Sequence, residues 1–129
     1  MGLKTVIDPR IATITRQEHI VTLPPLCPVT GNPEAGELAI SYVPNGKLLE
    51  VYALSDYIAG FVGNKEVRDI EHLTEVVARD CAEVLGVAVQ VIGLFKLNIG
   101  QTVKVEVAAS PHLPALKEHC SAGDCVSPS

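Results

Sequence analysis

The chain contains no tryptophan, and its aromatic residues number only five, three tyrosines and two phenylalanines. So few aromatic rings argue against a stacking platform for single-stranded nucleic acid. No apolar run approaches the ~18 residues that a membrane-spanning helix requires. Asp8, Pro9 and Arg10 interrupt the N-terminal segment where a signal peptide would have its apolar core. We therefore expect a cytoplasmic protein with no membrane partner.

A surplus of basic residues is missing as well. The sequence has 10 lysines and arginines against 15 acidic residues, which gives a net charge of −5. Because affinity for phosphates comes from lysine and arginine, this balance argues against tight, non-specific binding of nucleic acid. It still allows a nucleic-acid substrate that is held by a local basic patch on an assembly.

What the chain does contain is the composition of one globular domain. Hydrophobic residues make up 47% of the 129 residues and charged residues 19%, which is typical of a folded domain with a single core. We expect one domain over residues 1–110, including an N-terminal extension over about residues 1–20. Residues 111–129 are expected to form a flexible tail.

Hydrophobic periodicity predicts the elements of this domain. Residues 36–42 alternate in polarity, as a half-buried strand does. The turn residues Pro44, Asn45 and Gly46 then predict a hairpin with a return strand over residues 47–52. Two helices are expected next, over residues 54–61 and 67–85, with Gly86 ending the second. A second hairpin is expected from residues 87–97 and 102–108, joined by a turn over residues 98–101.

The predicted order is strand, strand, helix, helix, strand, strand. This order indicates an α+β fold, a four-stranded antiparallel sheet with two helices on one face. The edges of such an open sheet promote association unless they are paired. Self-assembly into a closed ring would pair them, so we expect a ring-forming protein.

Three of the four cysteines offer little chemistry. Cys81 falls in the apolar pattern of the second helix and is read as a core residue. Cys120 and Cys125 form a C-x4-C pair beside His119, but this spacing is not a common zinc spacing and two further ligands would be needed. We therefore expect no metal site, and a flexible tail or a local disulfide for this pair.

Cys27 stands in a different setting. It lies among prolines and before Gly31, in a loop that such residues make rigid. Glu34 follows a turn that would bring its carboxyl group back towards the sulfur. A thiolate is a nucleophile, and a nearby carboxyl group can move the proton that addition to an unsaturated carbon requires. The alternative is a buried structural cysteine with a solvated Glu34.

Glu71 and His72 are a second candidate group, on the buried-side edge of the long helix. The carboxylate of Glu71 could accept N–H bonds from a guanine-like ring, with His72 as a proton donor or hydrogen-bond partner. The alternative, which the spacing alone favours, is a solvated helix face that continues the charged residues 65–69.

The stretch L-C-P-V-T-G-N-P-E over residues 26–34 closely resembles the nucleophile loop of the QueF family, nitrile reductases that act on 7-cyano-7-deazaguanine. The resemblance covers residues 20–110 and implies the tunnelling fold (T-fold). It implies that Cys27 adds to the nitrile carbon to form a thioimide, and that Glu34 stands where the family has an aspartate that acts as general acid. It also implies that Glu71 anchors the purine-like edge, with Asp69 as a competing choice, and that Glu50 opens the nicotinamide motif.

That nicotinamide motif is where the chain departs from the reductases. Tyr52 and Ser55 stand where the motif has lysines, and Asp56 adds a negative charge. A phosphorylated nicotinamide needs cationic partners, so NADPH binding should be severely weakened.

The departure favours a branch of the family that lacks the motif, the QueF-like archaeosine synthases. The resemblance then implies an amidine-forming enzyme that acts on tRNA carrying 7-cyano-7-deazaguanine (preQ0) in its dihydrouridine arm. Ammonia is the co-substrate, no redox cofactor is used, and the subunits assemble into two stacked rings whose sites lie between subunits.

Two other functions stay open at this point. One is an NADPH-dependent nitrile reductase with an altered cofactor site, which would draw cations such as Lys47 or Arg68 from a neighbouring subunit. The other is a non-catalytic or divergent T-fold protein that binds a purine or pterin, in which Cys27 is idle.

Overall fold

A computed structural model of the chain describes residues 2–27, 29–64, 66–67 and 69–111. The predicted tail beyond residue 111, with Cys120 and Cys125, lies outside the described residues, as do Lys65 and Arg68. The elements in chain order are β1 (Thr5–Val6), the 3-10 helix η1 (Pro9–Thr13), β2 (Gln17–Leu23), β3 (Ala35–Tyr42), β4 (Leu48–Leu49), α1 (Val51–Ala59), α2 (Ile70–Leu85), β5 (Val89–Lys96) and β6 (Thr102–Ala109).

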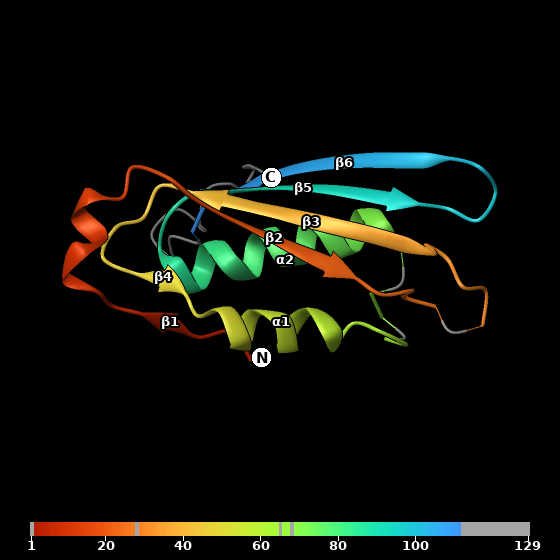
Figure 1. Cartoon of the computed structure of the whole chain (residues 1–129), viewed down its shortest axis with the longest axis horizontal. Coiled ribbons are helices and arrows are strands. Elements are labelled where there is room, and N and C mark those ends of the chain that lie inside the picture. Colours follow the sequence, from red (N-terminus) through yellow and green to blue (C-terminus); the bar gives the residue numbers. More distant parts are fainter. Residues whose placement is uncertain (1, 28, 65, 68, 112–129) are drawn as a thin grey trace, which may run out of the picture.

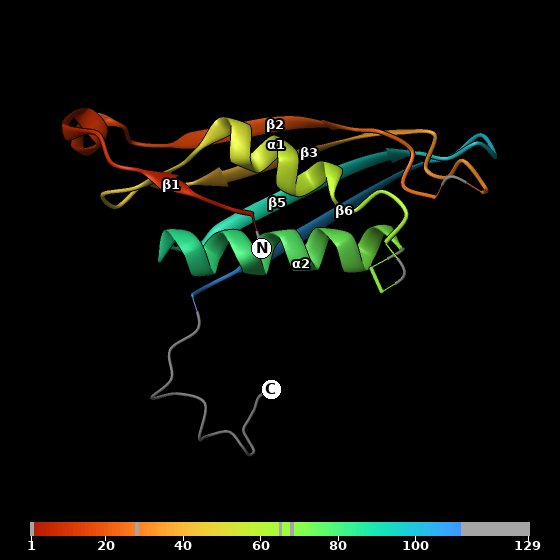
Figure 2. The ribbon, with the colours of Figure 1, turned by 90° about the horizontal axis from the view of Figure 1, so that it is seen from below.

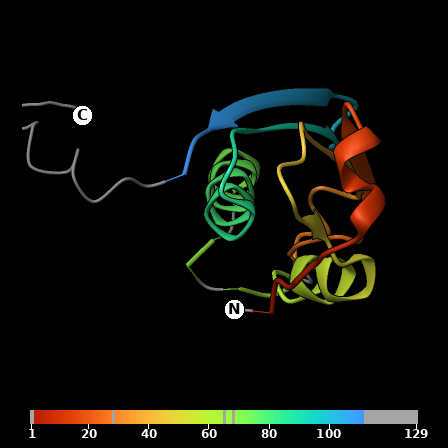
Figure 3. The same cartoon turned by 90° about the vertical axis from the view of Figure 1, so that its left-hand side faces the viewer.

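The main sheet is antiparallel, in the order β2-β3-β5-β6. Both helices lie on one of its faces, α2 against β5 and β6 and α1 on the side of β2 (Figures 1, 2 and 3). This arrangement confirms the predicted α+β class and the two helices on one face. Within the chain the sheet is open, with β2 and β6 at its edges, and its closure into a ring stays a prediction.

The predicted first hairpin is wrong in its pairing. β3 forms as expected, but it pairs with β2 (Leu23 opposite Gly36) and with β5 (Tyr42 opposite Val89). Both of its edges are therefore taken, and the turn at residues 44–46 leads the chain out of the sheet. Of the expected return strand only β4 forms, and it pairs with β1 in a separate two-stranded sheet. The connection of the true first hairpin is the loop that carries Cys27.

Helix α2 is bounded by two capping residues. The Asp69 carboxylate accepts the backbone N–H of His72 at 2.6 Å, and Gly86 takes the left-handed conformation (φ 73°) that ends the helix. The helix thus begins at Ile70, three residues after the predicted start, because Asp69 supplies the cap.

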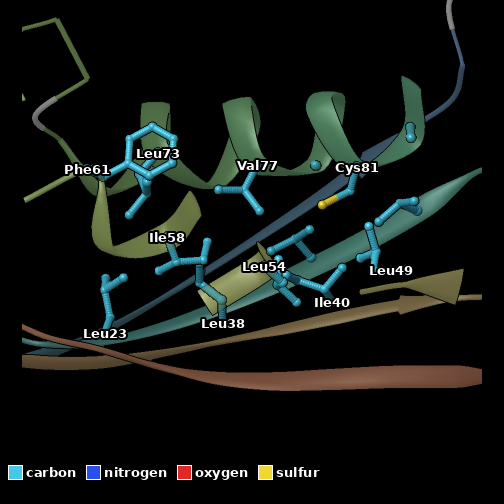
Figure 4. Close-up of a cluster of buried hydrophobic side chains, with 14 of the residues drawn as sticks. Leu23, Leu38, Ile40, Leu49, Leu54, Ile58, Phe61, Leu73, Val77 and Cys81 are labelled. Atoms are coloured by element: carbon cyan, nitrogen blue, oxygen red, sulfur yellow. The ribbon is translucent and has the colours of Figure 1, made fainter. Parts of the chain in front are cut away.

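The core fills the space between the helices and the sheet. Its α2 side chains include Leu73, Val77 and Cys81, which face Leu38, Ile40 and other apolar residues of the sheet and of α1 (Figure 4). Each such fully buried Leu, Ile or Val contributes about 1.5–3 kcal/mol relative to exposure. No helix among the described residues combines the length and the apolar character needed to cross a bilayer.

Candidate active site

The Cys27 loop, residues 24–34, joins β2 to β3 at one end of the sheet (Figure 1). Cys27 itself is half-buried, and Leu26 before it is only 4% exposed and belongs to the core cluster. The thiol is therefore held next to a fixed apolar anchor and within reach of solvent, as a reactive cysteine requires.

Three contacts fix Cys27 inside this loop. Its N–H donates to the carbonyl oxygen of Asn32 at 3.3 Å, and its own carbonyl oxygen accepts the N–H of Gly31 at 2.8 Å. The N–H of Thr30 points at its Sγ atom, at 3.5 Å. An N–H group that donates to sulfur favours the thiolate over the thiol, because hydrogen bonding to the charged form stabilises that form. The loop thus places a backbone N–H dipole against the Cys27 sulfur, and the role of this sulfur as a nucleophile stays a prediction.

Two other segments hold the loop in place. The N–H of Gly63, which follows α1, donates to the carbonyl oxygen of Leu26 at 2.8 Å. On the opposite side Asn98, in the turn between β5 and β6, donates its backbone N–H to Oδ1 of Asn32 at 2.9 Å and its side-chain amide to the carbonyl oxygen of Thr30 at 3.0 Å. Sequence reasoning missed Asn32 and Asn98, since nothing in a single sequence connects residues 66 positions apart.

Glu34 ends the loop, and the structure pairs it with Lys96 of β5. The Glu34 N–H donates to the Lys96 carbonyl oxygen at 2.8 Å, and the Glu34 carboxylate lies 3.3 Å from the Lys96 ammonium. Lys96 also lines a hollow of about 220 Å³ together with Ala35, Glu37 and Leu94. A carboxylate, an ammonium and a cavity thus meet beside the loop, and the role of Glu34 as the proton partner of Cys27 stays a prediction.

The first turn of α2 lies at the same end of the molecule as the Cys27 loop (Figure 2). Glu71 is exposed there, and His72 is half-buried with its backbone N–H bound to Asp69. The Asp69 carboxylate already serves its helix as a cap, whereas that of Glu71 has no hydrogen bond or ion pair with any described residue. This difference favours Glu71 over Asp69 as the group that a ligand would meet.

Glu50 lies apart from these residues, at the start of α1, whereas Gly63 and the Cys27 loop lie beyond the end of that helix. Its carboxylate caps the helix and accepts the N–H groups of Ala53 at 2.9 Å and Tyr52 at 3.0 Å. These backbone hydrogen bonds lower the pKa of Glu50. The structure thus gives Glu50 a role in helix capping, and its predicted part in ligand binding stays a prediction.

The residues compared above with the family's nicotinamide motif lie on α1. Tyr52, Ser55 and Asp56 are all exposed, so the helix presents an acid where the motif would present lysines. A hollow of about 360 Å³ between β2 and α1 is lined by His19, Ile20, Val21, Thr22, Val51, Leu54 and Ser55, and none of these described lining residues is a lysine or arginine. The described part of the chain also holds no group of three His, Cys, Asp or Glu side chains arranged to bind a metal.

Comparisons with known proteins agree with the resemblance. No family model matches the sequence. Over 74 residues, 54% of this chain, the sequence is 32% identical to the NADPH-dependent 7-cyano-7-deazaguanine reductase of Syntrophus aciditrophicus (strain SB). The match spans 51% of that reductase, so the chain spans about half the length of this curated relative.

Among solved structures, the fold is similar to the apo crystal structure of the archaeosine synthase QueF-Like. The TM-score is 0.61, with 17% sequence identity, and the similarity covers 78% of this chain and 97% of that one. At this identity the structural likeness shows the fold, and the reductase match adds a likeness in sequence. The predicted resemblance is thus confirmed, as a likeness in sequence to a 7-cyano-7-deazaguanine reductase over about half of the chain and as a likeness in fold to an archaeosine synthase QueF-Like.

Proposed function

We propose that the chain is an amidine-forming archaeosine synthase. In this proposal it converts the nitrile of 7-cyano-7-deazaguanine in the dihydrouridine arm of tRNA to the amidine archaeosine. Ammonia supplies the nitrogen, a thioimide on Cys27 is the intermediate, and NADPH takes no part.

The chemistry is two additions and one elimination. The Cys27 thiolate adds to the nitrile carbon, a C–S bond forms, and the nitrile nitrogen takes up a proton to give the thioimide. Ammonia then adds to the same carbon, and the C–S bond breaks with its electron pair on sulfur. The nitrile, ammonia and the proton already taken up become the amidine in its protonated form, the thiolate is regenerated, and no electrons are gained or lost.

The observation that carries this proposal is the setting of the Cys27 sulfur. The Thr30 N–H lies 3.5 Å from Sγ, which favours the thiolate both as the attacking group and as the leaving group. The likeness in fold to the archaeosine synthase QueF-Like supports the choice of reaction.

The surface of α1 supports ammonia over hydride as the second nucleophile. Tyr52 and Asp56 are exposed, and the neighbouring hollow has no cationic lining. The phosphates of NADPH would find no lysine or arginine there, and a dinucleotide phosphate depends on such groups for its affinity.

Glu71 is proposed to anchor the purine-like edge, with His72 as its hydrogen-bonding neighbour. Both stand in the first turn of α2, and the Glu71 side chain is exposed there.

The open edges β2 and β6 support assembly of several subunits into rings, proposed as two stacked rings. Light scattering or native mass spectrometry of the purified chain measures that assembly, and a monomer at assay concentration would contradict it.

A second candidate is favoured by the sequence match to an NADPH-dependent reductase. In that reaction hydride, and not ammonia, would attack the thioimide. A cofactor site would then have to take its cations from a neighbouring subunit.

Mass spectrometry of tRNA nucleosides separates the candidates. The protein is incubated with tRNA carrying the nitrile base and with isotopically labelled ammonium, and parallel samples contain free 7-cyano-7-deazaguanine with NADPH. We expect a labelled amidine in tRNA, abolished in Cys27→Ala, and no consumption of NADPH. NADPH consumption that depends on the free base would establish the reductase. A covalent adduct without amidine would refute the synthase, and no adduct at all would point to a non-catalytic purine or pterin binder.

A further inference from the structure

Asn98 stands at the start of the turn that joins β5 to β6. The turn is closed by the N–H of Leu97, which donates to the carbonyl oxygen of Gln101 at 2.8 Å. It is carried by two strands paired along their whole length, from Lys96 opposite Thr102 to Val89 opposite Ala109. Asn98 is therefore mounted on a rigid hairpin, although it is itself exposed.

Both acceptors of Asn98 contact Cys27 directly. Asn32 binds the Asn98 N–H through Oδ1 and accepts the Cys27 N–H through its carbonyl oxygen. Thr30 binds the Asn98 side-chain amide through its carbonyl oxygen and points its own N–H at the Cys27 sulfur. A further bond, from the Asn32 N–H to Oγ1 of Thr30 at 3.3 Å, links the two routes.

Of the two connections from Asn98 to Cys27, the one through Thr30 is the more easily broken by a shift of the loop. The contact between the Thr30 N–H and Sγ is 3.5 Å long, so a small shift of the loop would lose it. The Asn98 amide holds the Thr30 carbonyl, and this carbonyl belongs to the same peptide group as the Gly31 N–H that closes the turn onto Cys27. Movement of that peptide would turn the Thr30 N–H away from the sulfur.

We propose that Asn98 is a positioning residue for the Cys27 thiolate, acting through Thr30 and Asn32 and not by touching the substrate. The inference rests on the proposed role of Cys27 as the nucleophile. It extends that role to a turn that lies 71 residues further along the chain and that carries no reactive group of its own.

The test measures the thiol and not the reaction with nitrile. Alkylation of Cys27 by iodoacetamide is followed over about pH 6 to 10 by peptide-resolved mass spectrometry, in the full-length chain. Asn98→Ala and Asn98→Asp both remove the amide donor, Asn98→Gln retains one, and Asn45→Ala alters an exposed asparagine in the turn beyond the far end of β3. Thermal unfolding of each variant is recorded in parallel.

We expect the pH midpoint of Cys27 alkylation to rise in Asn98→Ala and Asn98→Asp, with the thiolate fraction near neutral pH reduced about three- to tenfold, the effect of one hydrogen bond. Asn98→Gln should recover part of the loss, and Asn45→Ala should match the wild type. A residue that only stabilised the fold would lower the unfolding temperature and leave the midpoint unchanged. That result, or wild-type midpoints in both Asn98→Ala and Asn98→Asp, overturns the proposal.

A second pair of variants keeps the test decisive if the Asn98 variants fail to fold. Asn32→Ala removes the acceptor of the Asn98 N–H, whereas Asn32→Gln keeps an amide oxygen without adding a charge beside the sulfur. A raised midpoint in Asn32→Ala alone supports the proposal, and equal midpoints overturn it. These outcomes are distinct from failure of the proposed function, which would show as absence of amidine or adduct in a wild-type chain whose Cys27 midpoint still depends on Asn98.

Discussion

The carbonyl oxygen of Leu26 accepts the backbone N–H of Gly63 at 2.8 Å. Leu26 directly precedes Cys27 and is buried in the core, while Gly63 lies just beyond α1 with φ at 74°. The Cys27 loop is thus bound to the segment between the helices at a residue whose backbone conformation suits glycine. This hydrogen bond holds the loop at Leu26, and the two hydrogen bonds from Asn98 hold it at Thr30 and Asn32.

Gly63→Ala should therefore affect both stability and Cys27. A Cβ at this position meets no atom within 4 Å, so its cost is the left-handed backbone alone, about 1 kcal/mol. Gly46→Ala is the matched control, because Gly46 has φ at 85°, an equally open surrounding and a place beyond the far end of β3. Denaturant unfolding should show similar losses in both, whereas Cys27 alkylation should change only in Gly63→Ala. Equal alkylation in the two variants would mean that the Leu26 contact does not govern the thiol.

The sequence predicted those features that depend on local pattern. Alternation gave β3, β5 and β6, the apolar spacing of three and four gave α2, and prolines around Cys27 gave a fixed loop. It did not give the partner of β3, because alternation marks a half-buried strand without saying which strand lies beside it. The return strand predicted over residues 47–52 was wrong because Glu50 was interpreted as part of an extended segment. Its carboxylate instead caps α1, so the chain is helical from Val51.

The candidate site was predicted from the same kind of local information, and the roles of its residues stay predictions. Cys27, Glu34 and Glu71 were identified from residue type and resemblance, and the structure places the Cys27 loop and the start of α2 at one end of the fold. The Lys96 partner of Glu34 and the contacts of Asn98 come from strand pairing across more than 60 residues. Long-range register of this kind follows from the assembled sheet and leaves no mark in a local pattern.

Replacement of Glu34 tests its predicted role in proton transfer. Glu34→Gln should slow adduct formation with the nitrile by about 100-fold or more, the usual contribution of a positioned acid or base. Glu34→Asp, which keeps the carboxyl group, should retain most of the rate. The control is Lys96→Met, which removes the half-exposed ion pair and should change the free energy of unfolding by less than about 1 kcal/mol. A rate in Glu34→Gln within about threefold of wild type would remove Glu34 from the mechanism.

The choice between Glu71 and Asp69 can be made without disturbing α2. Asparagine caps a helix about as well as aspartate, so Asp69→Asn should remain folded while it loses its charge. If Glu71 anchors the base, Glu71→Gln should weaken binding of 7-cyano-7-deazaguanine about tenfold or more, as expected for a hydrogen bond to a charged group. The concentration dependence of adduct formation measures this. Weakened binding in Asp69→Asn with normal binding in Glu71→Gln would assign the anchor to Asp69.

A buried histidine gives the fold a dependence on pH that is separate from the chemistry. His19 is 8% exposed, and its Nε2 lies 2.9 Å from the Tyr42 hydroxyl oxygen, which also accepts the N–H of Leu49 at 3.0 Å. Burial lowers the pKa of His19 below its ordinary value of 6.5, so the ring is neutral in the folded chain near neutral pH.

The sign of the effect follows from that shift. The unfolded chain takes up a proton at the ordinary pKa and the folded chain only at a lower one, so the stability due to the neutral ring is complete above about pH 6.5 and is lost as the pH falls below it. Denaturant unfolding of the wild type between about pH 7 and pH 5 should show this loss, at up to about 1.4 kcal/mol per pH unit. His19→Gln, which cannot take up the proton, should be less stable near pH 7 but flatter across this interval. Asp8, whose carboxylate caps η1 by accepting the Arg10 N–H, and Glu50 both have pKa values lowered by hydrogen bonds. They titrate at more acidic pH and should not contribute to this loss. Parallel curves for the two proteins would show that His19 is not the group that titrates.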